Sequence, residues 1–220
     1  MGSLRAAGYE ITPDASEADT IVVNTCGFIE AARQESVEAI LDAARLKTDG
    51  RAQRLVVAGC LVERYQAELK AELPEVDAFI GTNQIGEILG VCDPRTDTRA
   101  LPVVPMGNKT ATYLYDDAAP RLLTTPSYSA YVKIAEGCDR PCAFCSIPLM
   151  RGGYRSRRFG SVISEARKLA EQGVKELVLV AQDSTRYERN IRQRPFDRYG
   201  TRCGKQNRRV QRFEDHRLPG

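Results

Sequence analysis

The stretch RLVVAGC, residues 54–60, is a short run of aliphatic residues that ends in a cysteine. A similar run, ADTIVVNTC at 18–26, also ends in a cysteine, and AFIG at 78–81 is a shorter third run. Such runs are typical of buried strands. The segments 29–47 and 62–73, which follow the first two runs, carry apolar residues at helical spacing. This alternation of strands and helices predicts an α/β fold with a parallel sheet.

Cys26 and Cys60 are the residues at which the two longer runs end. Ligands of open α/β sheets bind beyond the carboxyl ends of the strands, so we expect the two cysteines to face the same crevice. On this pattern alone they are either a pair of ligands or two small buried hydrophobic residues.

A second α/β unit is predicted after residue 127. Its expected elements are a strand over 130–136, a helix over 161–173 and a strand over 176–183. Ser161 is the expected N-cap of the helix and Gly173 its expected end. A strand–helix–strand unit of this kind takes a right-handed crossover between parallel strands.

These patterns divide the chain into four parts. Residues 1–92 are expected to form one domain and 128–187 another. The segment between them, 93–127, has five prolines and little periodicity, which indicates a linker. Residues 188–220 carry ten basic and four acidic residues without sustained apolar periodicity, and we expect them to be disordered.

The composition, 42% hydrophobic and 28% charged, is ordinary for a globular protein. No apolar run is long enough to span a membrane, and the first residues lack the pattern of a secretory signal. Seven cysteines in such a chain argue against a disulfide framework. They favour metal binding or redox chemistry, and we expect the protein to be cytoplasmic.

Three of the cysteines lie close together in EGCDRPCAFCSIP, residues 136–148: Cys138, Cys142 and Cys145. A structural zinc site needs four ligands, usually in two pairs, and the only histidine of the chain is His216 in the basic tail. Thiolates also hold iron–sulfur clusters, and three of them would leave one iron of a four-iron cluster open to a small molecule. An iron–sulfur cluster is therefore the better interpretation, and zinc is the alternative.

The spacing CxxxCxxC after the first strand of an α/β unit resembles the radical S-adenosylmethionine (SAM) enzymes. The resemblance implies a [4Fe–4S] cluster on Cys138, Cys142 and Cys145. The open iron of that cluster binds SAM, and its electron cleaves SAM to a 5′-deoxyadenosyl radical.

The same resemblance implies SAM contacts from Gln182 and Asp183 at the end of the next strand, although a capped strand end has the same pattern. Arg151, like Arg155 and Arg157, is expected to bind the SAM carboxylate or an acidic substrate, unless it belongs to a solvated basic loop.

Four stretches together are similar to the methylthiotransferases: NTCGFIEAARQES (24–36), VVAGC (56–60), KIAEGCDRPCAFCSIPLMRGGYRSR (133–157) and LVLVAQDSTRY (177–187). Within this family, NTCGFI, IPLMRG and AQDSTRY resemble the RimO branch, which modifies an aspartate of small-subunit ribosomal protein twelve. The resemblance implies an N-terminal parallel-sheet methylthiotransferase domain, followed by the beginning of a radical SAM partial (β/α) barrel.

Cys26 and Cys60 acquire a role through this resemblance, because three cysteines of the N-terminal domain hold a second [4Fe–4S] cluster in the family. The third ligand is expected in an SLGCxKNxxDSE-like stretch that would precede the first residues of this sequence. Cys92 lies outside the family's pattern and is interpreted as a structural or incidental thiol.

The resemblance stops after Tyr187. We therefore expect residues 188–220 to be a frameshifted or misassembled end of the gene. A nucleic-acid-binding tail is the alternative, since basic clusters attract phosphate.

The implied enzyme abstracts hydrogen from the β-carbon of the target aspartate and inserts a methylthio group. Its implied cofactors are two [4Fe–4S] clusters and SAM. Its implied partners are small-subunit ribosomal protein twelve and an electron donor such as flavodoxin or ferredoxin. The alternatives are a tRNA adenosine methylthiotransferase of the MiaB branch and an inactive metal-binding fragment.

Overall fold

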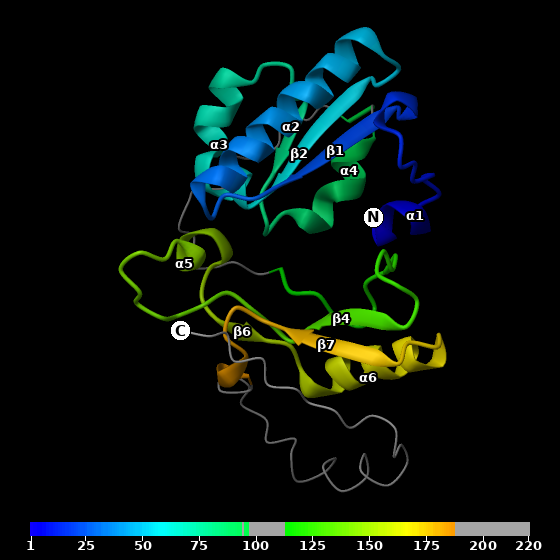
Figure 1. The fold of residues 1–220 in the computed structure, drawn as a ribbon, viewed down its shortest axis with the longest axis vertical. Helices are drawn as coiled ribbons and strands as arrows, with labels where there is room; N and C mark the ends of the chain where they lie inside the picture. Colours follow the sequence, from blue (N-terminus) through cyan, green and yellow to red (C-terminus); the bar gives the residue numbers. More distant parts are fainter. Residues whose placement is uncertain (94, 97–112, 188–220) are drawn as a thin grey trace, which may run out of the picture.

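The computed structural model describes residues 1–93, 95–96 and 113–187 (Figure 1). Its elements before residue 93 are α1 Gly2–Ala6, η1 Ala15–Glu17, β1 Thr20–Thr25, α2 Glu30–Asp49, β2 Arg54–Gly59, α3 Cys60–Glu72, β3 Ala78–Ile80, η2 Ile85–Glu87 and α4 Ile88–Cys92. Its later elements are β4 Ser129–Lys133, β5 Ala135–Glu136, α5 Ile147–Arg151, β6 Arg155–Ser156, α6 Phe159–Glu171, β7 Glu176–Val180 and η4 Ser184–Arg186. The predictions for the tail fall outside the described residues.

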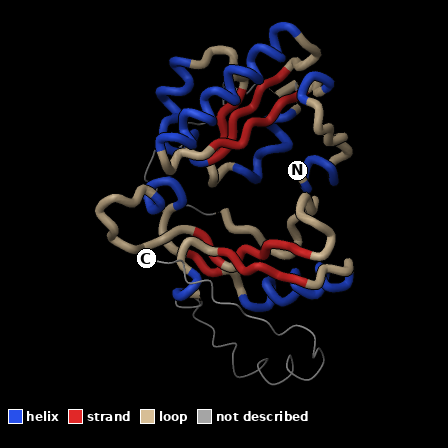
Figure 2. Tube along the Cα trace, viewed as in Figure 1, coloured by secondary structure: helices blue, strands red, loops and turns tan. Residues whose placement is uncertain are grey.

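The first three strands form a parallel sheet in the order β1-β2-β3. The central strand, β2, is buried along its whole length. Its side chains alternate between two apolar clusters: Leu55 and Val57 pack with residues of α2 and α3, whereas Val56 and Ala58 pack with residues of α1 and α4. The sheet therefore has helices on both faces, as Figures 1 and 2 show, and this arrangement explains the continuous aliphatic run in the sequence.

The second unit pairs β4 with β7 in parallel, and α6 connects them along the chain. Ala130 and Val132 of β4 pack on Val162 and Leu169 of α6. The short strands β5 and β6 pair antiparallel next to this unit. None of the helices in the described ranges is long and apolar enough to cross a membrane.

The predicted α/β class with a parallel sheet is confirmed, and the differences lie at the ends of elements. The helix predicted over 62–73 already begins at Cys60. The strand predicted over 130–136 is divided between β4 and β5, and the strand predicted over 176–183 ends at Val180. In the proposed linker, residues 113–127 contain no helix or strand.

The prediction that Ser161 caps α6 is wrong, because the helix begins two residues earlier and has Arg158 at its N-cap. The Ser161 hydroxyl instead accepts hydrogen bonds from Arg157 Nη2 at 2.9 Å and from the Asp117 amide at 3.1 Å. Gly173 ends the helix as predicted, with a positive φ of 92°.

A buried carboxylate on α6, that of Glu165, holds the second unit together. It pairs with Arg157 and with Arg121, which comes from the segment before β4. Arg157 also donates to the Lys133 carbonyl at 2.8 Å, and its side chain is only 2% exposed. The position of Arg157 is that of a structural ion pair rather than of a basic loop open to solvent.

We predict that Glu165→Gln lowers the free energy of unfolding by about 3 kcal/mol, because it leaves the buried Arg157 guanidinium without a counter-charge. Urea denaturation followed by circular dichroism would measure the change. The control is Glu171→Gln at the exposed end of the same helix, which should alter stability by less than about 0.5 kcal/mol. Equal losses in the two variants would contradict the prediction.

Candidate metal and cofactor site

Cys26 and Cys60 lie at the same edge of the first sheet, directly after the carboxyl ends of β1 and β2. Thr25 and Gly59 are partners in the register of β1 with β2, and each cysteine directly follows one of them. Cys60 is buried at the start of α3, whereas Cys26 is exposed. The Cys26 amide donates to the Ser36 hydroxyl of α2 at 3.1 Å, so α2 fixes the backbone of this loop.

Gly59 makes the abrupt change from β2 to α3 possible. Its φ is +114°, which L side chains rarely adopt, and an added Cβ would lie 2.5 Å from the Thr25 carbonyl oxygen. The glycine thus lets β1 approach closely and places Cys60 at the first position of the helix.

Cys138, Cys142 and Cys145 lie on the loop between β5 and α5, the cysteine loop. Cys138 is buried, Cys145 is half-buried and Cys142 is exposed. Phe144, between the last two, is 92% exposed. None of the six cysteines in the described part of the chain forms a disulfide.

The start of the cysteine loop packs tightly against the segment after α5. The Cys138 amide donates to the Gly152 carbonyl at 3.1 Å, and the Tyr154 amide donates to Asp139 Oδ1 at 2.8 Å. Gly137 has a φ of +78°, and a Cβ there would lie 2.3 Å from the Gly153 carbonyl oxygen. Only glycine can occupy position 137 this close to the Gly153 carbonyl without a movement of the backbone.

Gln182 and Asp183, at the carboxyl end of β7, both contact the cysteine loop. Gln182 Oε1 accepts from the Gly137 amide at 3.0 Å, and Asp183 Oδ2 accepts from Arg140 Nε at 2.9 Å. Hydrogen bonding from Thr185, together with Arg140, lowers the pKa of Asp183 despite its partial desolvation. These two residues therefore support the loop, and their SAM contact stays a prediction.

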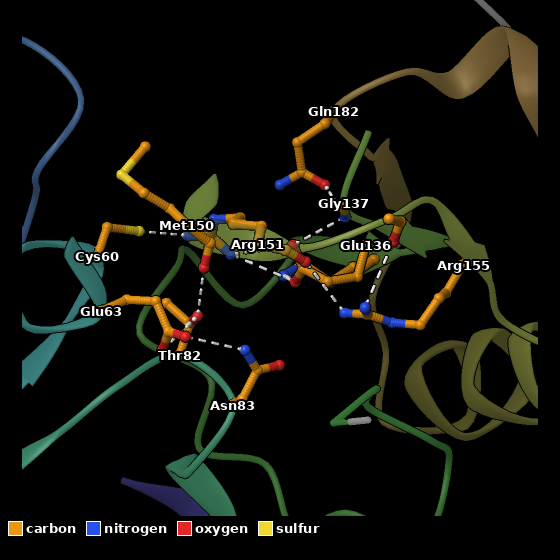
Figure 3. Close-up of polar contacts among 12 residues, drawn as sticks. Cys60, Glu63, Thr82, Asn83, Glu136, Gly137, Met150, Arg151, Arg155 and Gln182 are labelled. Carbon is orange, nitrogen blue, oxygen red and sulfur yellow. Dashed lines mark hydrogen bonds and ion pairs between the residues drawn. The ribbon is translucent and has the colours of Figure 1, made fainter. Parts of the chain in front are cut away.

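Arg151, the last residue of α5, reaches both units (Figure 3). Its Nη1 lies 3.2 and 3.3 Å from the two oxygens of Glu136, and its Nη2 lies 3.2 Å from Cys60 Sγ. Burial alone would raise the pKa of Glu136, but Lys133 and Arg151 outweigh burial and hold the pKa below its ordinary value. Glu136 is thus a buried carboxylate between two cations.

The sequence predictions did not include Glu136 or the Arg151–Cys60 contact. The signal for Glu136 is an acidic residue at the end of the strand predicted over 130–136, two positions before the first cysteine of the loop. The Arg151–Cys60 contact joins residues 91 positions apart, so no local sequence pattern predicts it.

The candidate donors are all thiols, three on the cysteine loop and two at the carboxyl ends of neighbouring strands. Among the described residues, no three His, Cys, Asp or Glu side chains are grouped so that they could hold one metal ion. A cluster binds each thiolate through a different iron, so its ligands need not converge on one point. Thiolates are the donors that such clusters use, and a cluster on the three thiols of this loop stays a prediction.

Comparisons with known proteins identify relatives of this chain. The family described as "Uncharacterized protein family UPF0004" matches residues 1–81. A protein of Solibacter usitatus named "Ribosomal protein uS12 methylthiotransferase RimO" is 51% identical over 191 residues, which cover 87% of this chain and 39% of that protein. The resemblance to the RimO-type methylthiotransferases is confirmed.

Proteins of the same name give similar values. The one from Symbiobacterium thermophilum is 52% identical, over 89% of this chain and 40% of its own length. The one from Koribacter versatilis is 45% identical, over 87% of this chain and 45% of its own length. The chain therefore spans about two fifths of the length of these RimO relatives.

We predict that Gly137→Ala lowers the free energy of unfolding by about 1 to 3 kcal/mol, since alanine would be strained at this φ and would press on the Gly153 carbonyl. The variant should also bind less iron after anaerobic reconstitution, because the cysteine loop must shift. Urea denaturation and iron analysis would measure the two effects.

The matched control is Gly160→Ala in α6, where an added Cβ meets nothing within 4 Å. It should leave iron binding unchanged and leave stability equal or slightly raised, because alanine favours helices. Wild-type stability and iron content in Gly137→Ala would contradict the role given to Gly137.

Proposed function

We propose that this chain carries the cluster-binding and SAM-binding part of a RimO-type methylthiotransferase. The observation that carries the proposal is the cysteine loop, which presents three thiols next to the carboxyl end of a parallel strand. The identity of 45–52% to proteins named as uS12 methylthiotransferases supports it. The proposed substrate is an aspartate of uS12, small-subunit ribosomal protein twelve, modified at its β-carbon.

In this proposal, residues 1–92 are the N-terminal methylthiotransferase domain, 93–127 the linker and 128–187 the beginning of the radical SAM partial barrel. The parallel pairing of β4 with β7 around α6 supports the last assignment. The protein would work in the cytoplasm and receive electrons from a small donor such as flavodoxin or ferredoxin.

Cys138, Cys142 and Cys145 would hold one [4Fe–4S] cluster as thiolates, with one iron left for SAM. When bound there, the cluster and SAM supply the electron transfer and the carbon radical that the reaction needs. Gln182 and Asp183 are the proposed SAM contacts, because they lie beyond the end of β7 and touch the cysteine loop. They orient the loop, and Asp183 keeps Arg140 beside it.

Cys26 and Cys60 are the proposed ligands of a second cluster at the edge of the first sheet. Their register-matched positions after β1 and β2 support this assignment. The bonds of Ser36 to the Cys26 loop and the left-handed Gly59 hold the two backbones in place.

Anaerobic reconstitution with iron and sulfide, followed by iron analysis and assay of reductive SAM cleavage, tests the cluster proposal. We expect about four irons or more and cleavage of SAM by the dithionite-reduced wild type. Cys142→Ala should abolish cleavage while leaving the fold intact, because Cys142 is exposed.

The matched control is Cys92→Ala, which removes a thiol from the core around α4. It should retain iron and SAM cleavage even if its stability falls. Zinc in place of iron, no cleavage by the wild type, or cleavage retained in Cys142→Ala would overturn the proposal.

The substrate is tested separately, by incubating the reconstituted protein and SAM with uS12 or with tRNA. We expect mass spectrometry to find the added methylthio group on an aspartate of uS12 and none on tRNA. Modification of tRNA adenosine alone would favour the MiaB-type alternative.

A further inference from the structure

A continuous chain of hydrogen bonds joins the end of β7 to the start of α3 (Figure 3). Gln182 Oε1 accepts from the Gly137 amide, which also donates to Glu136 Oε1 at 3.2 Å. Glu136 in turn accepts from Arg151, and Arg151 donates to Cys60 Sγ. The chain thus begins beside the cysteine loop and ends at a cysteine of the other sheet.

Arg151 is held in place from several directions. Its carbonyl accepts from Arg155 Nη2 at 3.2 Å, and the neighbouring Met150 carbonyl accepts from Thr82 Oγ1 at 2.9 Å. Thr82 lies just beyond β3, so a second contact between the units runs beside the Arg151 contact. Only 29% of the Arg151 side chain is exposed.

The geometry requires arginine rather than any cation. Nη1 donates a hydrogen bond to Glu136 and Nη2 donates one to Cys60. Because the guanidinium is planar, the directions of these two hydrogen bonds are fixed relative to each other. A lysine ammonium is a single point charge on a flexible stem and cannot span both partners in this way.

We propose that Arg151 is a positioning residue that fixes the Cys60 sulfur relative to the cysteine loop. Its guanidinium donates hydrogen bonds to both Glu136, the residue before the cysteine loop, and Cys60, the first residue of α3. The inference rests on the proposed function only in treating Cys60 as a cluster ligand, since the bridge itself requires no metal. The consequence is that the two sets of cysteines keep a constant separation.

Hydrogen–deuterium exchange of the metal-free chain tests the bridge. Two sets of amides report on it: those of Leu149, Met150 and Gly152, bonded within and just after α5, and those of Gly81 and Gln84, bonded next to Thr82. Arg151→Met should accelerate exchange in both sets about tenfold or more, because it removes the charge-assisted hydrogen bonds to both Glu136 and Cys60. Amides of β2 should be unaffected.

A double-mutant cycle identifies the partner. Cys60→Ala should accelerate exchange in the same amides, and the double variant should exchange no faster than Arg151→Met alone. Arg151→Lys should restore part of the protection, because it keeps the charge but serves one partner. Arg45→Met, which removes an arginine that is 76% exposed on α2, should change nothing.

Additive effects of the two substitutions, or unchanged exchange in Arg151→Met, would overturn the inference. If Arg151→Met also accelerates exchange in β2, Arg151→Lys decides: protection equal to that of Arg151→Met would overturn the inference and partial protection would support it. The exchange experiment uses the metal-free chain without SAM, so its outcome does not depend on whether the protein cleaves SAM. A failure of this inference can therefore be distinguished from a failure of the proposed function.

Discussion

Parallel strand pairing is the constraint on which the proposed site depends. Paired parallel strands end at a common edge, and four of the residues proposed as ligands or contacts follow such ends. Cys26 and Cys60 follow β1 and β2, while Gln182 and Asp183 follow β7. The chain needs only tight turns after these strands to gather side chains that are far apart in sequence.

Buried ion pairs connect segments of the structure that are not joined to each other by regular backbone hydrogen bonds. Glu165 joins Arg121 and Arg157 under β4, and Glu136 joins Lys133 and Arg151 at the junction of the two units. Buried ion pairs are weak sources of net stability, yet removing one member leaves an uncompensated charge. Their contribution here is to specify how loops and sheets fit together.

The sequence predicted well those features that depend on local pattern. The aliphatic run at β2 is buried on both faces, whereas β1 is buried on one face and leaves Val22 39% exposed. The helical spacing after both runs is sufficient to identify α2 and α3. The three loop cysteines were chosen by spacing alone, and their ligand role stays a prediction. The comparisons confirm the family resemblance on which the interpretation of Cys26 and Cys60 depends.

Long-range contacts and the elements α5 and β6 could not be predicted. The five residues of α5 and the two of β6 are too few to show a period. The contacts of Arg151 with Glu136 and Cys60 depend on α3 lying beside α5, which no local pattern shows, and its expected binding of SAM or an acidic substrate stays a prediction. The helix containing Ser161 begins at Phe159, and the Ser161 hydroxyl accepts hydrogen bonds from Arg157 and from Asp117, which is 44 positions away, instead of capping the helix.

The backbone of Gly59 also limits how this protein can vary. Any residue with a Cβ would have to adopt a left-handed conformation and intrude on the Thr25 carbonyl, so β1 and β2 would separate at the edge where both cysteines emerge. Gly90 meets no such neighbour, and substitution there leaves the sheet unaffected. In a library of randomised variants, position 59 would therefore accept almost nothing but glycine, whereas position 90 would tolerate many residues.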